Sequence, residues 1–309
     1  YRRQRQMCIR DSACGFLGRN LVRQLFDYEL VLMDQHPNLF DEAVRESWFY
    51  DYPIFHADIN ENIDVIKRKL KGVDIVIHLA NKTRIQPSWT EYEQYYRTNI
   101  TGSQKLFAAC QDANVKKFIY VSSSSVYGNN NTLRQHETDK LCPTNPYAVS
   151  KLAGEAALTV QAQGQDTELV IVRPFTMYGD FMDFGEEALV IAKFLKAWEE
   201  GEPLFIHGNG EQRRDFIHAL DAIQGLKLII EHGRHGDIFN IGTGESVSIK
   251  QLADVVSQKQ ILVPDRKGPV IRTEADISRL KKLGFKPRVK VLEWLTDQVN
   301  EHTIKEIIT

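Results

Sequence analysis

Residues 73–80 read Val73-Asp74-Ile75-Val76-Ile77-His78-Leu79-Ala80, a nearly continuous run of branched and apolar side chains. A strand with one face in water alternates polar and apolar residues, whereas a strand buried on both faces does not. This run therefore predicts a central strand of a parallel sheet. Similar runs occur at residues 29–34, 117–121 and 168–173.

Stretches with the helical spacing of apolar residues lie among these runs, at 20–28, 63–71, 92–113 and 147–163. Strands that alternate with helices predict an α/β fold, a doubly wound parallel sheet with right-handed crossovers. After Pro174 the alternation loosens into loops, short strands and helices such as 248–258 and 290–302. That change predicts a smaller second lobe.

The composition is that of an ordinary soluble globular protein, with 309 residues, 42% of them apolar and 26% charged. The 39 Lys and Arg nearly balance the 41 Asp and Glu, which argues against a nucleic acid or an acidic membrane as partner. No apolar run is long enough to span a bilayer. The scattered cysteines predict no disulfide framework, and His232 and His235 have no third ligand nearby that would predict a metal site. A cytoplasmic protein fits this composition.

Two segments about twenty residues apart carry groups that can move a proton. Residues 118–128 are an apolar strand followed by four serines, and Tyr147 and Lys151 are separated by three residues. On a helix that spacing places the phenol and the ammonium on one face, one turn apart. A cation beside a phenol favours the phenolate and lowers its pKa, so Lys151 is expected to lower the pKa of Tyr147. A serine at the strand end can share a proton with that tyrosine.

The segment Gly15-Phe16-Leu17-Gly18 opens the first predicted helix. Glycines at a helix start let the backbone approach a pyrophosphate, which the free amides and the helix dipole hold. Asp34 follows at the end of a predicted strand, where an acid accepts hydrogen bonds from ribose hydroxyls and repels a 2′-phosphate. Because Gln35 and His36 follow it rather than an arginine, NAD is favoured over NADP.

Together these segments resemble the extended short-chain dehydrogenase/reductase family, and within it the NAD-dependent sugar-nucleotide epimerase/dehydratase group. The resemblance runs from about Ala13 to about Gln298. It also includes Ala57-Asp58-Ile59, Ile77-His78-Leu79-Ala80, Asn99 in Thr98-Asn99-Ile100-Thr101-Gly102, Arg173 to Gly179, Gly208 to Phe216, Phe239-Asn240-Ile241-Gly242 and Ala275-Asp276-Ile277-Ser278.

The resemblance implies a Rossmann-type NAD-binding domain over 1–173, to which 215–242 returns, and a substrate-binding lobe made of 174–214 and 243–309. It implies that Tyr147 is the base, that Lys151 holds the nicotinamide ribose, and that Ser123 bonds to the substrate oxygen. The catalytic residues are then Ser123, Tyr147, Lys151 and Asn99. The cofactor-binding residues are Gly15, Phe16, Leu17, Gly18, Asp34, Asp58, Ile59, Leu79, Ala80, Asn99, Tyr147, Lys151 and Phe175. The substrate-binding residues are Ser123, Thr176, Arg214 and Arg272. Helices 92–113 and 147–163 resemble those that pair in a homodimer.

The residues after Ser123 bear on the reaction. Dehydratases of this group carry an Asp-Glu pair immediately after the catalytic hydroxyl residue, whereas this chain has Ser124-Ser125. The resemblance therefore implies epimerisation through a transient ketone, and Thr176 resembles the UDP-uronate 4-epimerases. Two alternatives stay open: a net redox enzyme of the same fold, a reductase or decarboxylase, and a non-catalytic NAD-binding sensor or scaffold.

The start of the chain departs from the family pattern. Members usually open with an apolar strand and Thr-Gly, whereas Asp11-Ser12 stand here after basic and polar residues. A charged strand is not expected at the centre of a sheet. We therefore expect that residues 1–12 are not the natural start and form no central strand.

Overall fold

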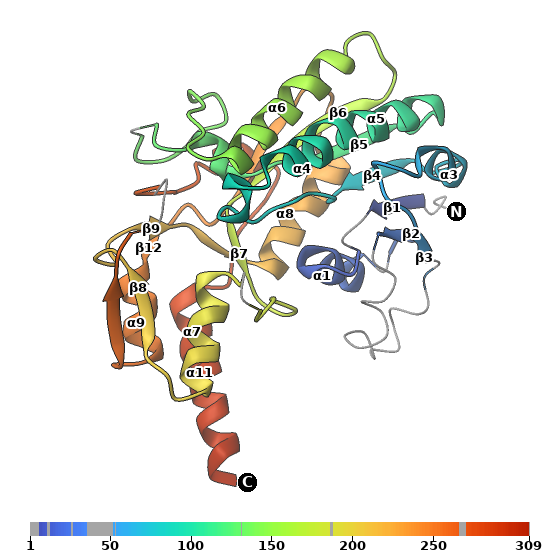
Figure 1. Ribbon diagram of the computed structural model, residues 1–309. Coiled ribbons are helices and arrows are strands. Elements are labelled where there is room, and N and C mark those ends of the chain that lie inside the picture. The colour runs from blue at the N-terminus through green and yellow to red at the C-terminus, as the bar shows by residue number, and fades with distance from the viewer. Residues whose placement is uncertain are drawn as a thin grey trace.

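The computed structural model describes residues 6–10, 13–25, 27–35, 52, 54–130, 132–185, 188–265 and 270–308, with the backbone alone at 6–10 and 302–308. Within these ranges, seven parallel strands form a sheet in the order β11-β6-β5-β4-β1-β2-β3 (Figure 1). Their bounds are β1 Gln6–Arg10, β2 Glu29–Asp34, β3 Ile54–His56, β4 Ile75–His78, β5 Lys117–Val121, β6 Glu168–Pro174 and β11 Ile238–Ile241. All four apolar runs supply strands of this sheet, which confirms the predicted fold class.

Helices cover both faces of the sheet (Figure 1). On one face α1 (Phe16–Gln24) packs beside α8 (Ala219–His232), and on the other α5 (Ser103–Asp112) packs between α3 (Ile63–Lys69) and α6 (Pro146–Gln161). Ile75 and Ile77 of β4 enter the first of these cores, whereas Val76 enters the second. Each strand residue is thus buried on one side or the other, which explains the continuous apolar run at 73–80.

The helix predicted over 92–113 is divided into three parts. They are α4 (Tyr92–Tyr96), a π-helical segment (Arg97–Gly102) and α5. At Gly102 the chain passes so close to Ile59 that an added Cβ would lie 2.4 Å from its Cδ1. The helix predicted at 20–28 begins earlier, at Phe16, because the glycine turn leads directly into it.

Most of the elements after β6 form a second group with a core of its own around Phe194, Phe216 and Leu252. Its strands are β7 Thr176–Tyr178, β8 Leu204–His207, β9 Arg213–Arg214, β10 Phe216–His218, β12 Val247–Ser248 and β13 Gln260–Val263. They pair as β10 with β7, β12 with β9 and β13 with β8. Its helices are α7 Val190–Glu199, α9 Ile249–Val256 and α11 Val291–Ile308, whereas α10 Ser278–Lys282 packs against α8 and β11 of the first core. In the part of the chain described, no helix has both the length and the apolar character needed to cross a membrane.

The first strand corrects one expectation. The backbone of Gln6–Arg10 pairs with β2 on one side and with β4 on the other, so it lies in the middle of the sheet. The three inner residues of this strand are Met7, Cys8 and Ile9, and their apolar character suits a central position. The expectations for residues 1–5 and 11–12 lie outside the described residues.

Candidate active site

The predicted cofactor residues of the first half meet at the carboxyl edge of the sheet, where α1 follows β1. Gly15 is the residue before α1, and no side chain caps this helix start. Asp34, the last residue of β2, is buried, and its Oδ2 accepts a hydrogen bond from the Cys14 amide over 3.1 Å. Because Gly15, Phe16 and Leu17 at the start of α1 are only half-buried, a pyrophosphate can approach the backbone there, while Gly18 within the first turn of the helix is buried.

The next strands bring four more predicted residues to the same edge. Asp58 and Ile59 follow β3, and Leu79 and Ala80 follow β4. The Asp58 carboxylate accepts from the Asn60 amide at 2.7 Å, while Ile59, Leu79 and Ala80 are buried. An acid near the start of α1, with apolar residues directly after the neighbouring strands, fits a dinucleotide that lies across the strand ends.

Tyr147 and Ser123 lie together, from elements on either side of a long loop. Asn145 caps α6 by accepting from the Ala148 amide at 2.9 Å, and Tyr147 follows in the first turn. Ser123 ends the extended chain after β5 and accepts from the Ser125 amide at 3.1 Å. Burial raises the pKa of Tyr147, and a hydrogen bond with Ser123 opposes that rise. The predicted Ser-Tyr contact is therefore present.

Lys151 is fully buried one turn further along α6. Its Nζ donates to Asn81 Oδ1 and to the Val121 carbonyl, both at 2.6 Å. Burial lowers the pKa of Lys151 to about 7, and the charge of Glu155 opposes this. The expectation that Lys151 lowers the pKa of Tyr147 is wrong for this structure, because burial dominates and raises that pKa.

Asn99 holds the loop after β4 and touches neither reactive side chain by a hydrogen bond. Its Oδ1 accepts from the Lys82 amide at 2.9 Å, and its Nδ2 donates to the Lys82 carbonyl at 3.0 Å and to Ser150 Oγ at 2.8 Å. These bonds tie the π-helical segment to that loop and to α6. Asn99, predicted as catalytic, is thus placed as a support of the site.

Three of the predicted substrate residues, Thr176, Arg214 and Arg272, lie on or beside β7 and β9 of the second group of elements. The pKa of Arg214 is lowered to about 10 by burial, and its guanidinium donates to the Arg213 carbonyl at 2.7 Å. Within the described ranges no ion pair to Arg214 is found. Arg272 pairs with Glu274 at 2.6 Å, so its charge is already compensated.

Two other predicted residues line the end of β6 and the start of β7. Phe175 is buried directly after β6, and its ring centroid lies 6.3 Å from that of Tyr127. Thr176 is half-buried, and its amide donates to the Asp215 carbonyl at 3.0 Å. The Asp215 carboxylate also accepts from the Thr243, Gly244 and Ala275 amides. Asp215 therefore ties the start of β7 to the loop after β11 and to the segment around Ala275.

Sequence reasoning missed a buried ion pair behind the site. The guanidinium of Arg173 binds both carboxylate oxygens of Glu155, at 3.0 and 2.6 Å, and also Tyr127 Oη at 3.0 Å. Glu155 lies one turn after Lys151 on α6. The only signal for it was the charged pattern Lys151-x-x-x-Glu155, which is common on exposed helices.

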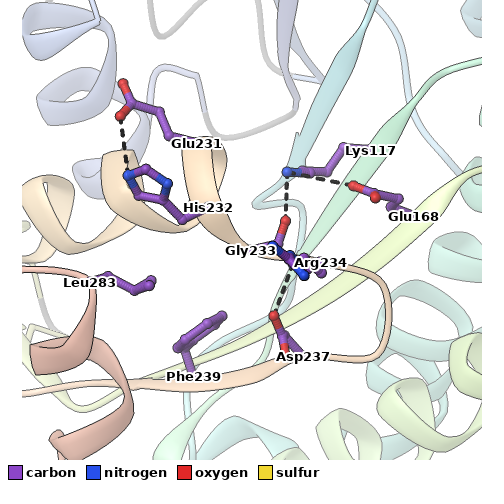
Figure 2. A pocket seen from close by; sticks show the side chains of 9 residues that line it. All are labelled: Lys117, Glu168, Glu231, His232, Gly233, Arg234, Asp237, Phe239 and Leu283. Carbon is purple, nitrogen blue, oxygen red and sulfur yellow. Dashed lines mark hydrogen bonds and ion pairs between the residues drawn. The ribbon is translucent and has the colours of Figure 1, made fainter.

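A separate cavity of about 590 Å³ lies at the opposite, amino-terminal edge of the sheet (Figure 2). Lys117 at the start of β5 donates there to the Ile230 and Gly233 carbonyls, at 3.0 and 2.7 Å, and thus caps the end of α8. Glu168 is 3.6 Å from the same ammonium. The charges of Lys117 and Glu168 thus compensate one another. None of the predicted site residues lines this cavity.

A doubly wound sheet with a glycine turn, an acid after its second strand and a Ser-Tyr-Lys set at its carboxyl edge defines an enzyme that acts with a nicotinamide dinucleotide. The sequence pattern of the NAD dependent epimerase/dehydratase family matches residues 13–242, and the chain belongs to this family. NAD is accordingly its cofactor, and the residues at the strand ends fit it.

Relatives within the family differ in their reactions. The mouse dTDP-D-glucose 4,6-dehydratase is 32% identical, over 92% of this chain and 86% of the relative. A UDP-N-acetylglucosamine 4-epimerase from Methanobrevibacter ruminantium, solved with UDP-N-acetylmuramic acid, is 29% identical, with a TM-score of 0.85 over 98% of this chain and 100% of that one. A UDP-glucuronic acid 4-epimerase from Bacillus cereus, solved with UDP-glucuronic acid and NAD, is 27% identical, with a TM-score of 0.85 over 96% and 99%.

Proposed function

We propose that this chain epimerises a UDP-hexose or UDP-hexuronate at carbon 4 through a transient keto-sugar, with NAD regenerated in each cycle. The observation that carries this proposal is the turn after Ser123. It continues as Ser124 and Ser125 into a short 3₁₀ helix whose first turn contains no acidic residue. Elimination of water from the sugar needs an acid and a base beyond the tyrosine, and hydroxyls with ordinary pKa values supply neither.

The side chains divide the work as follows. Tyr147 accepts the proton of the sugar hydroxyl, and Ser123 bonds to the same oxygen and to the phenol. Lys151 donates to the nicotinamide ribose, while Gly15 to Gly18 and Asp34 hold the pyrophosphate and the adenosine ribose. When bound, NAD supplies a hydride acceptor at the sugar carbon and, in its oxidised form, a positive ring that favours the phenolate. Return of the same hydride to the other face of the ketone would give the epimer, with Tyr147 giving back the proton.

The experiment that tests this proposal is incubation of the protein and NAD with UDP-, GDP-, CDP- and dTDP-linked sugars, with the products read by NMR. The expected result is a mixture of two 4-epimers of a UDP-sugar without net formation of NADH. A 4-keto-6-deoxy product would favour a dehydratase, and stoichiometric NADH a net redox enzyme. NAD binding without conversion of any sugar would favour a sensor or scaffold.

Thr176 favours a hexuronate within this proposal. It is half-buried at the start of β7, directly after Phe175, and so lies at the carboxyl edge shared with the serines. A hydroxyl there can donate to a carboxylate oxygen without the cost of burying a second charge. Both UDP-hexose and UDP-hexuronate are therefore included among the test sugars.

Replacement of Arg214 by Gln is expected to weaken UDP binding by about tenfold to a hundredfold, since a hydrogen bond to a charged group contributes about 1.5–3 kcal/mol. Arg214 is a half-buried cation without a described counter-charge, which suits a diphosphate. Calorimetric titration with UDP measures the change. The matched control is Arg272→Gln, whose effect should be smaller because Glu274 already compensates that arginine. Equal losses in both variants would contradict the assignment.

We further propose a homodimer in which α4, α5 and α6 pair with those of a second copy. Tyr92 on α4 and Val149 and Val160 on α6 are apolar yet 46%, 40% and 67% exposed. Burial of such side chains between two copies would stabilise the pair by the hydrophobic effect. Light scattering should give the mass of a dimer at micromolar concentration, and Val160→Glu should shift it toward the monomer. A clean monomer for the unchanged chain would contradict this.

A further inference from the structure

The Lys151 ammonium is held by two oxygen atoms that lie at or just beyond the ends of two neighbouring strands. Asn81 Oδ1, in the loop after β4, and the Val121 carbonyl, at the end of β5, each accept from Nζ at 2.6 Å. Lys151 Nζ also lies over the Tyr120 ring, 4.3 Å from the ring centroid. An ammonium has three N–H donors, so two of them are directed by these oxygens and one remains for a ligand.

Asn81 cannot turn its oxygen away from Lys151 without losing other bonds. Its Nδ2 donates to the Leu79 carbonyl at 3.1 Å, which identifies the other amide atom as the oxygen that faces Nζ. The next residue, Lys82, has both of its backbone groups bound by the buried Asn99. The loop that carries Asn81 is therefore fixed to the π-helical segment, and through Ser150 to the helix of Lys151 itself.

Among the described residues, Asn81 supplies the side-chain acceptor of Lys151, and the titratable groups that face the ammonium do not replace it. Burial raises the pKa of both Tyr120 and Tyr147, so both phenols are neutral near neutral pH. The carboxylate of Glu155 is bound on both oxygens by Arg173, and it acts on Lys151 only through its charge. With the pKa of Lys151 lowered to about 7, the loss or gain of one acceptor decides its protonation near neutral pH.

We propose that Asn81 is a positioning residue of the active site, which directs the Lys151 ammonium so that its remaining N–H meets the hydroxyls of the nicotinamide ribose. This inference rests on the proposed role of Lys151 in holding NAD. A neutral amide suits the task because it orients the ammonium without an ion pair that would compete with the ribose. A carboxylate at this position would hold the ammonium more strongly, and an apolar side chain would leave a buried N–H unbonded.

The test is the affinity for NAD, measured by calorimetry across the neutral and alkaline range, for Asn81→Leu and Asn81→Asp. Leu has nearly the same volume but accepts no hydrogen bond. Asn81→Leu is expected to weaken NAD binding about tenfold at neutral pH and to move the alkaline loss of affinity down by about one pH unit. Asn81→Asp is expected to move that loss up by about one pH unit, because an adjacent anion favours the ammonium.

The matched control is Lys82→Met, in the same loop, whose ammonium points away to Glu91 at 2.9 Å. It should keep the pH dependence of the unchanged chain. If both Asn81 variants also keep it, the inference is overturned, and a shift by Asn81→Asp alone sustains it should the Leu variant not fold. NAD binding is read without a sugar. A chain that shows these shifts but converts no nucleotide-sugar would therefore refute the proposed epimerase and leave the assignment of Asn81 standing.

Discussion

Replacement of Tyr147 by Phe is expected to lower kcat for nucleotide-sugar epimerisation by about two to four orders of magnitude. Phe keeps the buried ring and its edge-on packing against Tyr95, whose centroid is 6.4 Å away. It removes the one oxygen that meets Ser123 and can take the sugar proton. Because Lys151 and its two acceptors are untouched, the affinity for NAD should change little. Steady-state kinetics and calorimetry with the same protein preparation measure both quantities.

The control for this variant is Tyr95→Phe, which removes a phenol from the neighbouring ring. The Tyr95 hydroxyl donates to the Arg84 carbonyl at 2.6 Å and is not bonded to Ser123. This variant should keep most of its turnover. Near-normal turnover in Tyr147→Phe, or an equal loss in both variants, would show that Tyr147 is not the base.

Replacement of Arg173 by Met is expected to lower the free energy of unfolding by about 3–5 kcal/mol, the usual cost of removing one partner of a buried ion pair. Arg173 and Glu155 have side chains only 3% and 5% exposed. The variant leaves the Glu155 carboxylate without its bidentate partner, and it also removes donors to Tyr127 Oη and to the Glu137 carbonyl. Equilibrium unfolding in urea measures the loss.

The double variant Arg173→Met with Glu155→Met separates the lost attraction from the burial of an unpaired charge. It should recover part of the stability, because two apolar side chains of similar length replace the pair. The comparison at the surface is Asp254→Asn, which breaks the exposed pair with Lys250 and should cost no more than about 1 kcal/mol. If Arg173→Met is no more destabilising than Asp254→Asn, the ion pair does not stabilise this fold.

The predictions from the sequence were most successful where one short segment carries the whole signal. The strands 29–34 and 117–121 were predicted with the bounds that the structure has, because burial on both faces leaves a continuous apolar run. The contact of Ser123 with Tyr147 was also foreseen, since each residue stands at the end of an element that is readable by itself. Family membership follows from the order of such segments along the chain.

Local patterns failed where a neighbour in space changed the local preference. The 92–113 stretch has helical spacing throughout, yet Asn99 binds the Lys82 backbone and Gly102 meets Ile59, so the middle becomes π-helical. Gln6–Arg10 appeared too polar for a central strand. Its backbone nevertheless pairs with both neighbours, because a strand's place is decided by the whole sheet and not by its flanking charges.

The sequence by itself thus determined the doubly wound sheet, the glycine turn with Asp34, and the presence of Ser123, Tyr147 and Lys151. Only the tertiary structure decided how these groups are tuned. Burial sets the direction of the pKa changes of Tyr147 and Lys151, and Asn81, 70 positions away, supplies an acceptor for the ammonium. The physical reason is that strand and helix patterns arise from near neighbours in the chain. Desolvation and hydrogen-bond partners depend on which distant segments the fold packs together.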